Sequence, residues 1–222
     1  MLQNSLYLCH QGQRDEQLDR FFFINTGVCS VSVMADGFSH CHASPHYVDW
    51  LGEQLYALEN TGSCCNELCG EVLRILSCND CYPGKASIAV IVSDQEKYRY
   101  ATLGDTRIYW PSHSFRTTDH SLAQRCIDRG NCPAEKLRDH PLRNQLTQFA
   151  GADSKHTLTW SERERTYHDA IIMCTDGFWS HFDDRFIHEI QTEASLHNAF
   201  RGMINKKTVP EDNVSVVLLR DL

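Results

Sequence analysis

Three aspartates stand at the ends of apolar runs that are typical of β-strands. Asp36 follows the run VSVMA and Asp176 follows AIIMCT, each with a glycine after it, whereas Asp212 and Asn213 precede VSVVLL. A carboxylate at the end of a buried strand is held by the sheet and still reaches solvent, which suits a hard divalent cation. A glycine after the acid lets a backbone carbonyl approach the same cation. The pattern indicates a metal site.

The same acids have a plainer interpretation. Asp-Gly is a frequent turn sequence, and any one of these positions taken alone is better explained as a turn. Three acids in the same context weaken that explanation. Periodicity does not show whether they converge in space.

The composition is that of one globular domain. The chain has 222 residues, 41% of them hydrophobic, and 21 Lys+Arg against 29 Asp+Glu give a formal net charge of −8. This acidic balance argues against non-specific nucleic-acid binding, which depends on basic residues. The N-terminus lacks the basic start and apolar run of a signal peptide, and no run could span a bilayer. We therefore expect a single cytoplasmic domain over residues 1–222, with no nucleic-acid or membrane partner.

The 11 cysteines allow two interpretations. Cys78 and Cys81 have the C-x-x-C spacing of zinc sites, and Cys65 and Cys69 are one helical turn apart. Short spacings of this kind also arise by chance, so we expect buried thiols in a reducing compartment. A zinc-stabilised interaction domain is the alternative.

The elements that must position the acids can be read from periodicity. Helices are predicted at 44–60, 67–76, 122–129, 185–192 and 194–205. Strands are predicted on both sides of the turn at 25–27 and at 86–92, 98–103, 107–110, 156–160, 170–174 and 214–219. The runs at 86–92, 98–103 and 107–110 suggest an antiparallel meander. Strands that pair across long separations, with helices inserted in pairs, indicate an α+β layered fold.

The sequence resembles the metal-dependent serine/threonine phosphatases of type 2C (the PPM family), in particular their compact bacterial members. The matching segments follow the family's order and are Gly12–Asp19, Met34–Phe38, Tyr100–Trp110, Thr117–Gln124, His140–Gly151, Met173–Phe182 and Glu211–Leu219. The resemblance implies a four-layer αββα sandwich, in which helices flank two antiparallel sheets. It also implies two Mn²⁺ or Mg²⁺ ions at one end of the sandwich, with a weaker third.

The resemblance assigns roles to individual residues. Asp36 would bridge the two ions with Gly37 adding its carbonyl, and Asp176 and Asp212 would complete the ligand set. Asp105 matches an acid that helps to hold the third ion. The resemblance also implies that Arg14 binds the substrate phosphate and that Asp19 supports a metal-bound water.

Two positions depart from the family's pattern. Leu18 stands where the family has a hydrogen-bonding residue, which should weaken the second metal. Phe38 stands where animal relatives place a histidine, and either His40 or His42 nearby could act as the general acid instead. Loop histidines exposed to solvent are the plainer interpretation, and a metal-bound water could supply the proton. We expect metal-dependent hydrolysis of phosphoserine and phosphothreonine in proteins by a metal-activated water. A weakened or inactive homologue that binds phosphoproteins is the alternative.

The resemblance also points to partners. We expect a phosphorylated protein substrate and an opposing bacterial Ser/Thr kinase or the target of that kinase. The run TDGFW at 175–179 is similar to members associated with type VI secretion, although five residues are a short match. The segment 119–144 lies where the family places a flap beside its active site, and it is either a substrate contact or a structural excursion.

Overall fold

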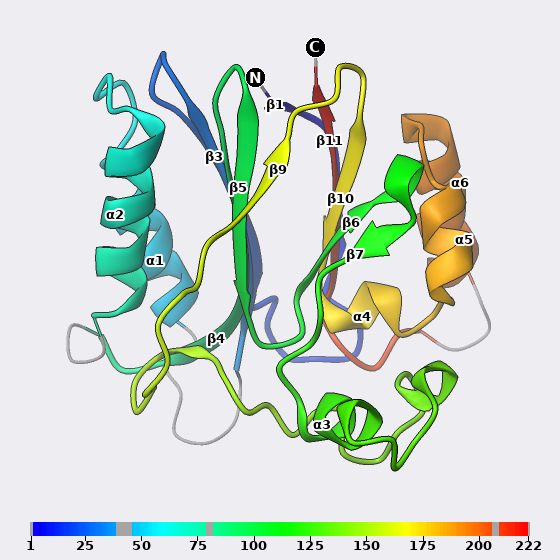
Figure 1. Ribbon diagram of the computed structural model, residues 1–222. Helices are drawn as coiled ribbons and strands as arrows, with labels where there is room; N and C mark the ends of the chain where they lie inside the picture. Colours follow the sequence, from blue (N-terminus) through cyan, green and yellow to red (C-terminus); the bar gives the residue numbers. More distant parts are fainter. Residues whose placement is uncertain (1, 39–45, 79–81, 206–208, 222) are drawn as a thin grey trace.

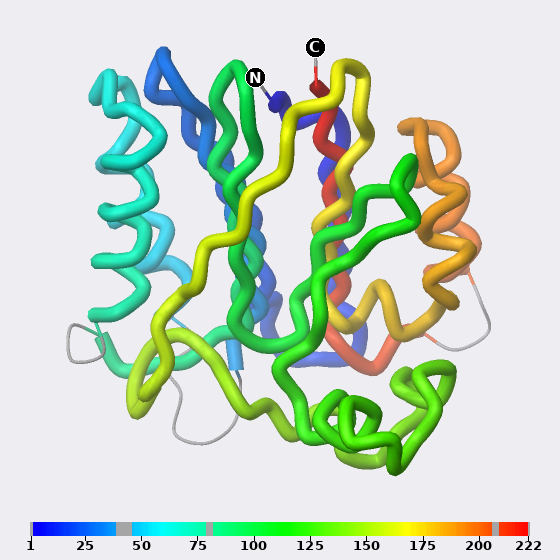
Figure 2. Tube along the Cα trace, in the orientation of Figure 1, coloured from blue at the N-terminus to red at the C-terminus, as the bar shows by residue number. Residues whose placement is uncertain are grey.

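The computed structural model describes residues 2–38, 46–78, 82–205 and 209–221. Two β-sheets lie face to face, and helices cover the outer face of each (Figure 1). Both chain termini lie at one end of the sheets, and the segment around α3 (Leu122–Asp128) lies at the other end (Figure 2). The predicted α+β sandwich of four layers is confirmed.

All strand pairs in both sheets are antiparallel. One sheet has the order β1 (Leu2–His10), β11 (Val214–Asp221), β10 (Ala170–Cys174), β6 (Arg107–Trp110) and β7 (Phe115–Arg116). The other has the order β2 (Asp19–Asn25), β3 (Ser30–Gly37), β4 (Lys85–Ser93), β5 (Lys97–Leu103) and β9 (Ser161–Glu164), with β8 (Ala150–Gly151) paired to β4. The second sheet therefore contains the strands that carry Asp19 and Asp36.

The alternation of side chains along the strands separates three apolar clusters. On β4, Ile88 and Val90 pack with α1 (Tyr47–Tyr56) and α2 (Cys65–Leu76), whereas Ala89 and Ile91 face the other sheet. The cluster between the sheets also contains Trp110 from β6. Successive side chains of a strand point to opposite faces, so a strand buried on both faces is apolar throughout. This explains the continuous apolar runs in the sequence.

The opposite outer face is covered by the C-terminal helices. α4 (Asp176–Trp179), α5 (Asp184–Glu189) and α6 (Glu193–Ile204) pack on β10 and β11 through the second cluster, which includes Phe178, Leu196 and Val216. The side chains of Asp183 and Thr192 cap the N-termini of α5 and α6. Within the part of the chain that the structure describes, no helix is long and apolar enough to cross a membrane.

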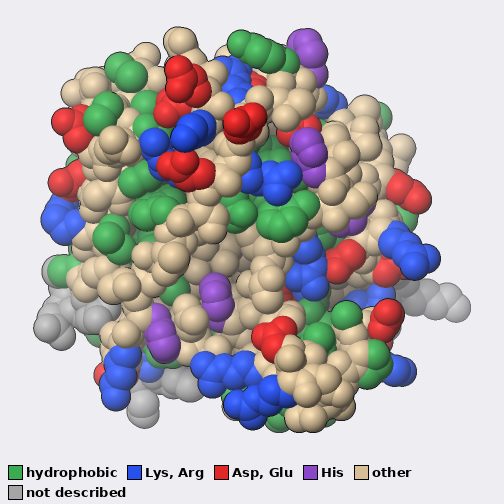
Figure 3. Space-filling view, viewed as in Figure 1, with side chains coloured by type: hydrophobic (Ala, Val, Ile, Leu, Met, Phe, Trp, Pro, Cys, Tyr) green, Lys and Arg blue, Asp and Glu red, His purple; other side chains and the backbone are tan. Residues whose placement is uncertain are grey.

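The flap leaves the sheets and returns to them at a fixed base. The backbone N–H of His120 donates to the carbonyl of Gly104 (2.8 Å), and that of Thr147 donates to the carbonyl of His120 (2.7 Å). Between these points lie α3 and a short 3₁₀ helix, Ala134–Lys136. Lys and Arg side chains gather along the lower edge of the molecule, where the flap lies (Figure 3).

Two predictions of local structure are wrong. The runs at 86–92 and 98–103 pair as β4 and β5, but 107–110 forms β6 in the other sheet, because the chain crosses between the sheets at Gly104. The strand predicted at 156–160 is unpaired, and β9 begins only at Ser161. The strand predicted at 170–174 is confirmed as β10, and the short helix α4 that follows it was not predicted. Strands β1, β7 and β8 were not predicted.

Candidate metal and phosphate site

The two N-terminal acids come together through strand register. β2 and β3 pair so that Asp19 lies opposite Asp36, at the end of the sheet away from the termini. Asp36 in turn lies opposite Ser87 of β4. Gly37 follows in the same strand and pairs with Ala86, so its carbonyl belongs to the same corner.

Asp105 reaches this corner from the turn between β5 and β6. The hydroxyl of Ser87 accepts hydrogen bonds from the backbone N–H groups of Asp105 (2.9 Å) and Thr106 (2.8 Å). The indole N–H of Trp179 donates to the carbonyl of Asp105 (2.9 Å). The turn is thus held by β4 on one side and by α4 on the other.

The two C-terminal acids arrive on neighbouring strands of the other sheet. Asp176 follows β10 and begins α4, and Asp212 lies just before β11, which pairs with β10. The hydroxyl of Thr175 donates to Oδ2 of Asp19 (2.9 Å), which ties this sheet to the first. The side chain of Asn213 donates to the carbonyls of Gln11 and Glu16, holding the loop that carries Arg14.

One cavity of about 420 Å³ collects the predicted residues. Asp36, Asp105, Asp176 and Asp212 all line it, together with Arg14. Its other lining residues are Gly37, Phe38, Lys85, Asn144, Gln145, Leu146 and Phe149. Asp19 lies behind these residues and is buried, and His40 lies outside the described residues. Strand ends that are far apart in the sequence therefore converge at one cavity, a point that the apolar pattern alone left open.

Burial and repulsion by neighbouring carboxylates raise the pKa values of Asp19, Asp36 and Asp176. Burial raises the pKa of Asp176 to about 6, and the Asp212 carboxylate adds to that rise. Burial, followed by Asp176 and Asp212, raises the pKa of Asp19 to about 7, against the hydrogen bond from Thr175. Burial also raises the pKa of Asp36 well above its usual value, with contributions from the carboxylates of Asp19, Asp176, Asp105 and Asp212. The five acids thus share one electrostatic field.

Two arginines are paired with these acids. Arg14 donates from Nε and Nη2 to the two carboxylate oxygens of Asp212 (2.9 and 2.8 Å). Arg143 of the flap donates to Oδ2 of Asp176 (3.3 Å) and lies 5.6 Å from the centre of the Trp179 ring. Arg14 thus lies among the acids, as a phosphate-binding role requires. In this structure both of its hydrogen bonds are made to the carboxylate of Asp212. From the sequence, Arg143 was expected only as one of several cations of the 119–144 segment that could contact a phosphoprotein, and its pairing with Asp176 was not predicted.

The donor set fits a hard divalent cation. Carboxylate and carbonyl oxygens are the ligands that such cations take, and Oδ1 of Asp19 is buried with no hydrogen-bond partner among the described residues. Across those residues, no three His, Cys, Asp or Glu side chains are close enough to form a complete protein cage. Mg²⁺ is commonly bound by one or two carboxylates and keeps several waters, so a looser set of acids suffices for it.

Leu18 stands at a position where the sequence departs from the family's pattern, and the structure places it beside the acids. It is 6% exposed, and its backbone N–H donates to the side chain of Asn213 (2.8 Å). Its carbonyl accepts from the N–H of Gly37 (3.3 Å), so the residue lies directly beside the Asp36–Gly37 corner. An alkyl group here offers no hydrogen bond to a ligand or to a water.

We expect the substitution Leu18→Glu to tighten Mn²⁺ binding by about tenfold, because outer-shell partners of metal sites contribute about 10–100-fold. The added carboxylate would also lower the melting temperature of the metal-free protein, since it joins a field of like charges. Isothermal titration with Mn²⁺ measures the first effect and calorimetry the second. Leu18→Gln, which has the same shape without the charge, is the matched control. An Mn²⁺ affinity that is the same in wild type and Leu18→Glu contradicts this expectation.

The cysteines do not support a zinc site. Cys65 and Cys69 are buried in the cluster between α2 and the sheet, as expected for small apolar side chains. Cys78 is disulfide-bonded, and Cys81 lies outside the described residues. Structural zinc needs four direct ligands at short range, and no three suitable side chains gather in the described ranges.

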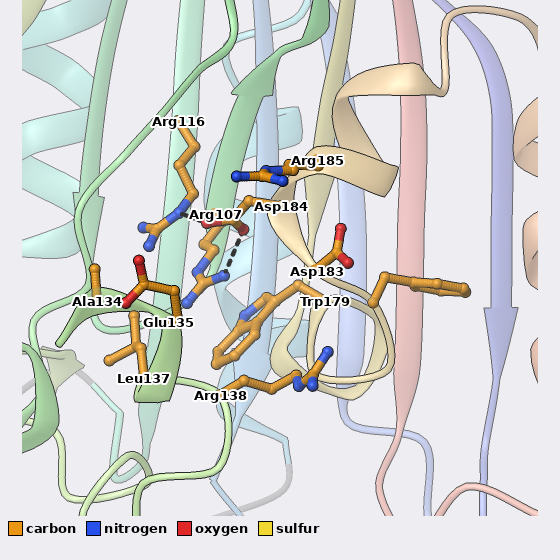
Figure 4. A pocket seen from close by; sticks show the side chains of 11 residues that line it. Arg107, Arg116, Ala134, Glu135, Leu137, Arg138, Trp179, Asp183, Asp184 and Arg185 are labelled. Carbon is orange, nitrogen blue, oxygen red and sulfur yellow. Dashed lines mark hydrogen bonds and ion pairs between the residues drawn. The ribbon is translucent and has the colours of Figure 1, made fainter.

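A second cavity, of about 520 Å³, lies between the flap and α5 (Figure 4). Two of its guanidinium groups, those of Arg107 and Arg116, contact Asp184 (3.3 and 2.7 Å), and Arg138 and Arg185 line it as well. None of the five acids lines it. The first cavity, where the acids at the strand ends meet Arg14, is therefore the better candidate for a metal and phosphate site.

Comparison with known proteins identifies the fold. No family model matches the chain. A curated protein of Streptococcus pyogenes serotype M6, named as a candidate protein phosphatase 2C-type, is 26% identical over 128 residues. These residues are 55% of this chain and 52% of the relative, so the chain spans about half the length of the curated protein that it matches.

Solved structures match over the whole chain. The serine/threonine phosphatase of S. agalactiae has a TM-score of 0.84 and 18% identity, with 100% of both chains covered. The chain has the type 2C phosphatase fold. The predicted resemblance to that family is confirmed.

Two further solved structures share the type 2C fold. PppA, a regulatory component of T6SS in Pseudomonas aeruginosa, has a TM-score of 0.79 and 16% identity, covering 100% of this chain and 98% of its own. The catalytic domain of the serine/threonine phosphatase PstP, in complex with 2 manganese ions, has a TM-score of 0.70 and 17% identity, with 99% and 97% covered. At these identities the likeness establishes the fold, and the site rests on the geometry above.

Proposed function

We propose that this chain is a metal-dependent protein phosphatase that hydrolyses phosphoserine and phosphothreonine. One observation carries the proposal: four aspartates and Arg14 line a single cavity where the ends of both sheets meet. The solved PstP domain of the same fold is in complex with 2 manganese ions. A concentration of carboxylates of this kind attracts an anionic substrate only when cations neutralise it.

The ligand roles follow the arrangement of the acids. Asp36 would bind both Mn²⁺ or Mg²⁺ ions and Gly37 would add its carbonyl, with Asp176 and Asp212 completing the set and Asp105 helping to hold a weaker third ion. When bound, the ions acidify a water for attack on phosphorus and offset the charge of the phosphoryl group. Asp19, held by Thr175, would orient water in this corner through its remaining oxygen.

Arg14 is the phosphate-binding side chain in this proposal. Its guanidinium is planar and donates two parallel hydrogen bonds, a geometry that matches phosphate oxygens as well as the carboxylate of Asp212. It would exchange one partner for the other as substrate enters. No histidine among the described residues lines the cavity, and a water molecule would donate the proton that turns the leaving alkoxide of serine or threonine into a hydroxyl.

The proposal extends to the setting of the reaction. An opposing Ser/Thr kinase would generate the substrate, and the chain would act in the cytoplasm. A type VI secretion context rests on the short TDGFW match and on the shared fold of PppA. Each of these is a proposal about partners, separate from the chemistry.

The test is hydrolysis of para-nitrophenyl phosphate with and without Mn²⁺. We expect turnover that requires the metal and that falls by about a hundredfold or more in Asp36→Asn, since loss of a ligand exceeds the 10–100-fold of an outer-shell loss. The exposed Asp128 of α3 provides the control, and Asp128→Asn should keep wild-type turnover. Wild-type protein with no Mn²⁺-dependent turnover above Asp36→Asn would overturn the proposal.

A second function is favoured by one specific observation. Leu18 is buried beside Gly37, and its side chain has no oxygen or nitrogen that could bind a second ion or a water on it. This is what we would expect of a homologue that has lost catalysis and still binds phosphoproteins. Such a protein would bind a phosphopeptide in the presence of Mn²⁺ without releasing phosphate. Measuring peptide binding and phosphate release on the same sample separates the two functions.

A further inference from the structure

Three apolar side chains line the same cavity as the acids, and we call them the apolar wall. They are Phe38, Leu146 and Phe149, and each is only half-buried. None of the three belongs to, or packs against, any of the three core clusters of described residues. Large apolar side chains that face a cavity without core packing are typical of a binding surface.

The wall is held in place by the backbone around it. The N–H of Phe38 donates to the carbonyl of Lys85 (2.9 Å), and Ala150 after Phe149 pairs with Ala86 of β4. Leu146 forms a β-bridge with Ser121 at the base of the flap. The wall is therefore formed before any ligand arrives, and little ordering is needed on binding.

The side chains of the wall contact one another. The rings of Phe38 and Phe149 are 5.8 Å apart between centroids and tilted by 58°. They make one apolar surface from two segments more than a hundred residues apart in the sequence. Only the fold brings these segments together.

Lys85 lies beside this wall, and its charge is already paired with a carboxylate. Its Nζ lies 3.0 Å from the carboxylate of Asp153 and 5.3 Å from the centre of the Phe149 ring. An acidic substrate side chain would therefore compete with Asp153 for the ammonium. The wall favours an apolar side chain over an acidic one.

We propose that this wall, Phe38, Leu146 and Phe149, receives an apolar side chain next to the phosphorylated residue of the substrate. The inference rests on the proposed function, which places the phosphate among the acids and Arg14 of the same cavity. Adjacent residues of a chain are 3.8 Å apart at their Cα atoms, and about 420 Å³ lies within the range of ligand pockets, so the cavity can hold both groups. The substrate class is a phosphopeptide with an apolar flank.

Three phosphothreonine peptides test the inference. They are identical except that both residues flanking phosphothreonine are Leu, Ala or Glu. We expect kcat/KM with Mn²⁺ to be about tenfold higher for the Leu peptide than for the Ala peptide, because differences of a few carbons in an apolar pocket are worth about 10–200-fold. The Glu peptide should be the poorest.

Variants of the wall locate the effect. In Phe149→Ala, and separately in Phe38→Ala, we expect the Leu-to-Ala ratio to fall from about tenfold to about threefold, because each variant removes half of the aromatic surface and with it about half of the free energy. Phe186→Ala is the matched control: this phenylalanine is 39% exposed on α5, outside the cavity, and its variant should keep the wild-type ratio. The ratio within each variant is insensitive to an overall loss of folded protein.

The outcomes separate this inference from the proposed function. Equal kcat/KM for the Leu and Ala peptides, or preference for the Glu peptide, overturns the inference while leaving Mn²⁺-dependent turnover of para-nitrophenyl phosphate intact. Absence of that turnover overturns the proposed function instead. In that case the three peptides are labelled, and their binding is measured by fluorescence anisotropy during titration with protein and Mn²⁺. Binding of the Leu peptide about tenfold tighter than of the Ala peptide supports the proposed role of the wall, and equal binding overturns it.

Discussion

The substitution Gly177→Ala should unfold the protein or cost more than about 4 kcal/mol of stability, which places it among the exceptional single substitutions. A Cβ at Gly177 would lie 1.9 Å from the carbonyl oxygen of Asn213 and 2.9 Å from its carbonyl carbon. Both contacts are with backbone, so no rotamer change relieves them. The first turn of α4 would have to move away from the segment that carries Asp212.

The stability of Gly177→Ala is measured by urea unfolding followed by circular dichroism. Gly202→Ala is the control, because a Cβ at Gly202 of α6 meets nothing within 4 Å. Alanine favours a helix over glycine by about 1 kcal/mol, so this control should match or exceed wild-type stability. Equal stability of the two variants would contradict this expectation, because it would show that α4 and the backbone of Asn213 can separate enough to admit a Cβ at little cost.

The positions of several acids in the site could be predicted from the sequence. The acids were recognisable because each stands at the end of an apolar run, and a strand end fixes the position of its side chain. The register of β2 and β3 then brings Asp19 opposite Asp36, and the pairing of β10 with β11 brings Asp176 beside Asp212. Position within an element was thus enough to find Asp36, Asp176 and Asp212, whereas Asp19 and Asp105 were assigned only through the resemblance to the family.

Contacts between elements were not predictable in the same way. The pairing of Arg14 with Asp212 and the tilt of Phe38 against Phe149 depend on how loops return to the sheets. The same limit explains the error at 107–110, whose apolar pattern suits either sheet. Alternation reports which residues are buried, and it carries no information on which sheet a strand joins.

The second large effect is expected at Arg107, which ties the base of the flap to the sheet. Its Nε and Nη2 donate to the two oxygens of Asp119 (both 2.7 Å), and the two side chains are 4% and 2% exposed. A third nitrogen donates to the hydroxyl of Tyr109 (2.9 Å), and the guanidinium lies 3.5 Å from the centre of the Trp179 ring. Removal of one partner of a buried ion pair leaves an uncompensated charge and costs about 3–5 kcal/mol.

We therefore expect Arg107→Ala to lose about 3–5 kcal/mol of the free energy of unfolding. Arg74→Ala, which removes a surface pair with Glu71 (2.9 Å), should stay within about 0.5 kcal/mol of wild type. The double variant Arg107→Met with Asp119→Leu separates charge from packing, because apolar residues of similar size often replace a buried pair without loss. Recovery of most of the lost stability in the double variant assigns the cost to the stranded carboxylate. If the double variant is as unstable as Arg107→Ala, the stabilising interaction is the contact of the guanidinium with the Trp179 ring. Because Trp179 donates a hydrogen bond to the carbonyl of Asp105, that contact would also hold the turn that carries Asp105 in the candidate site.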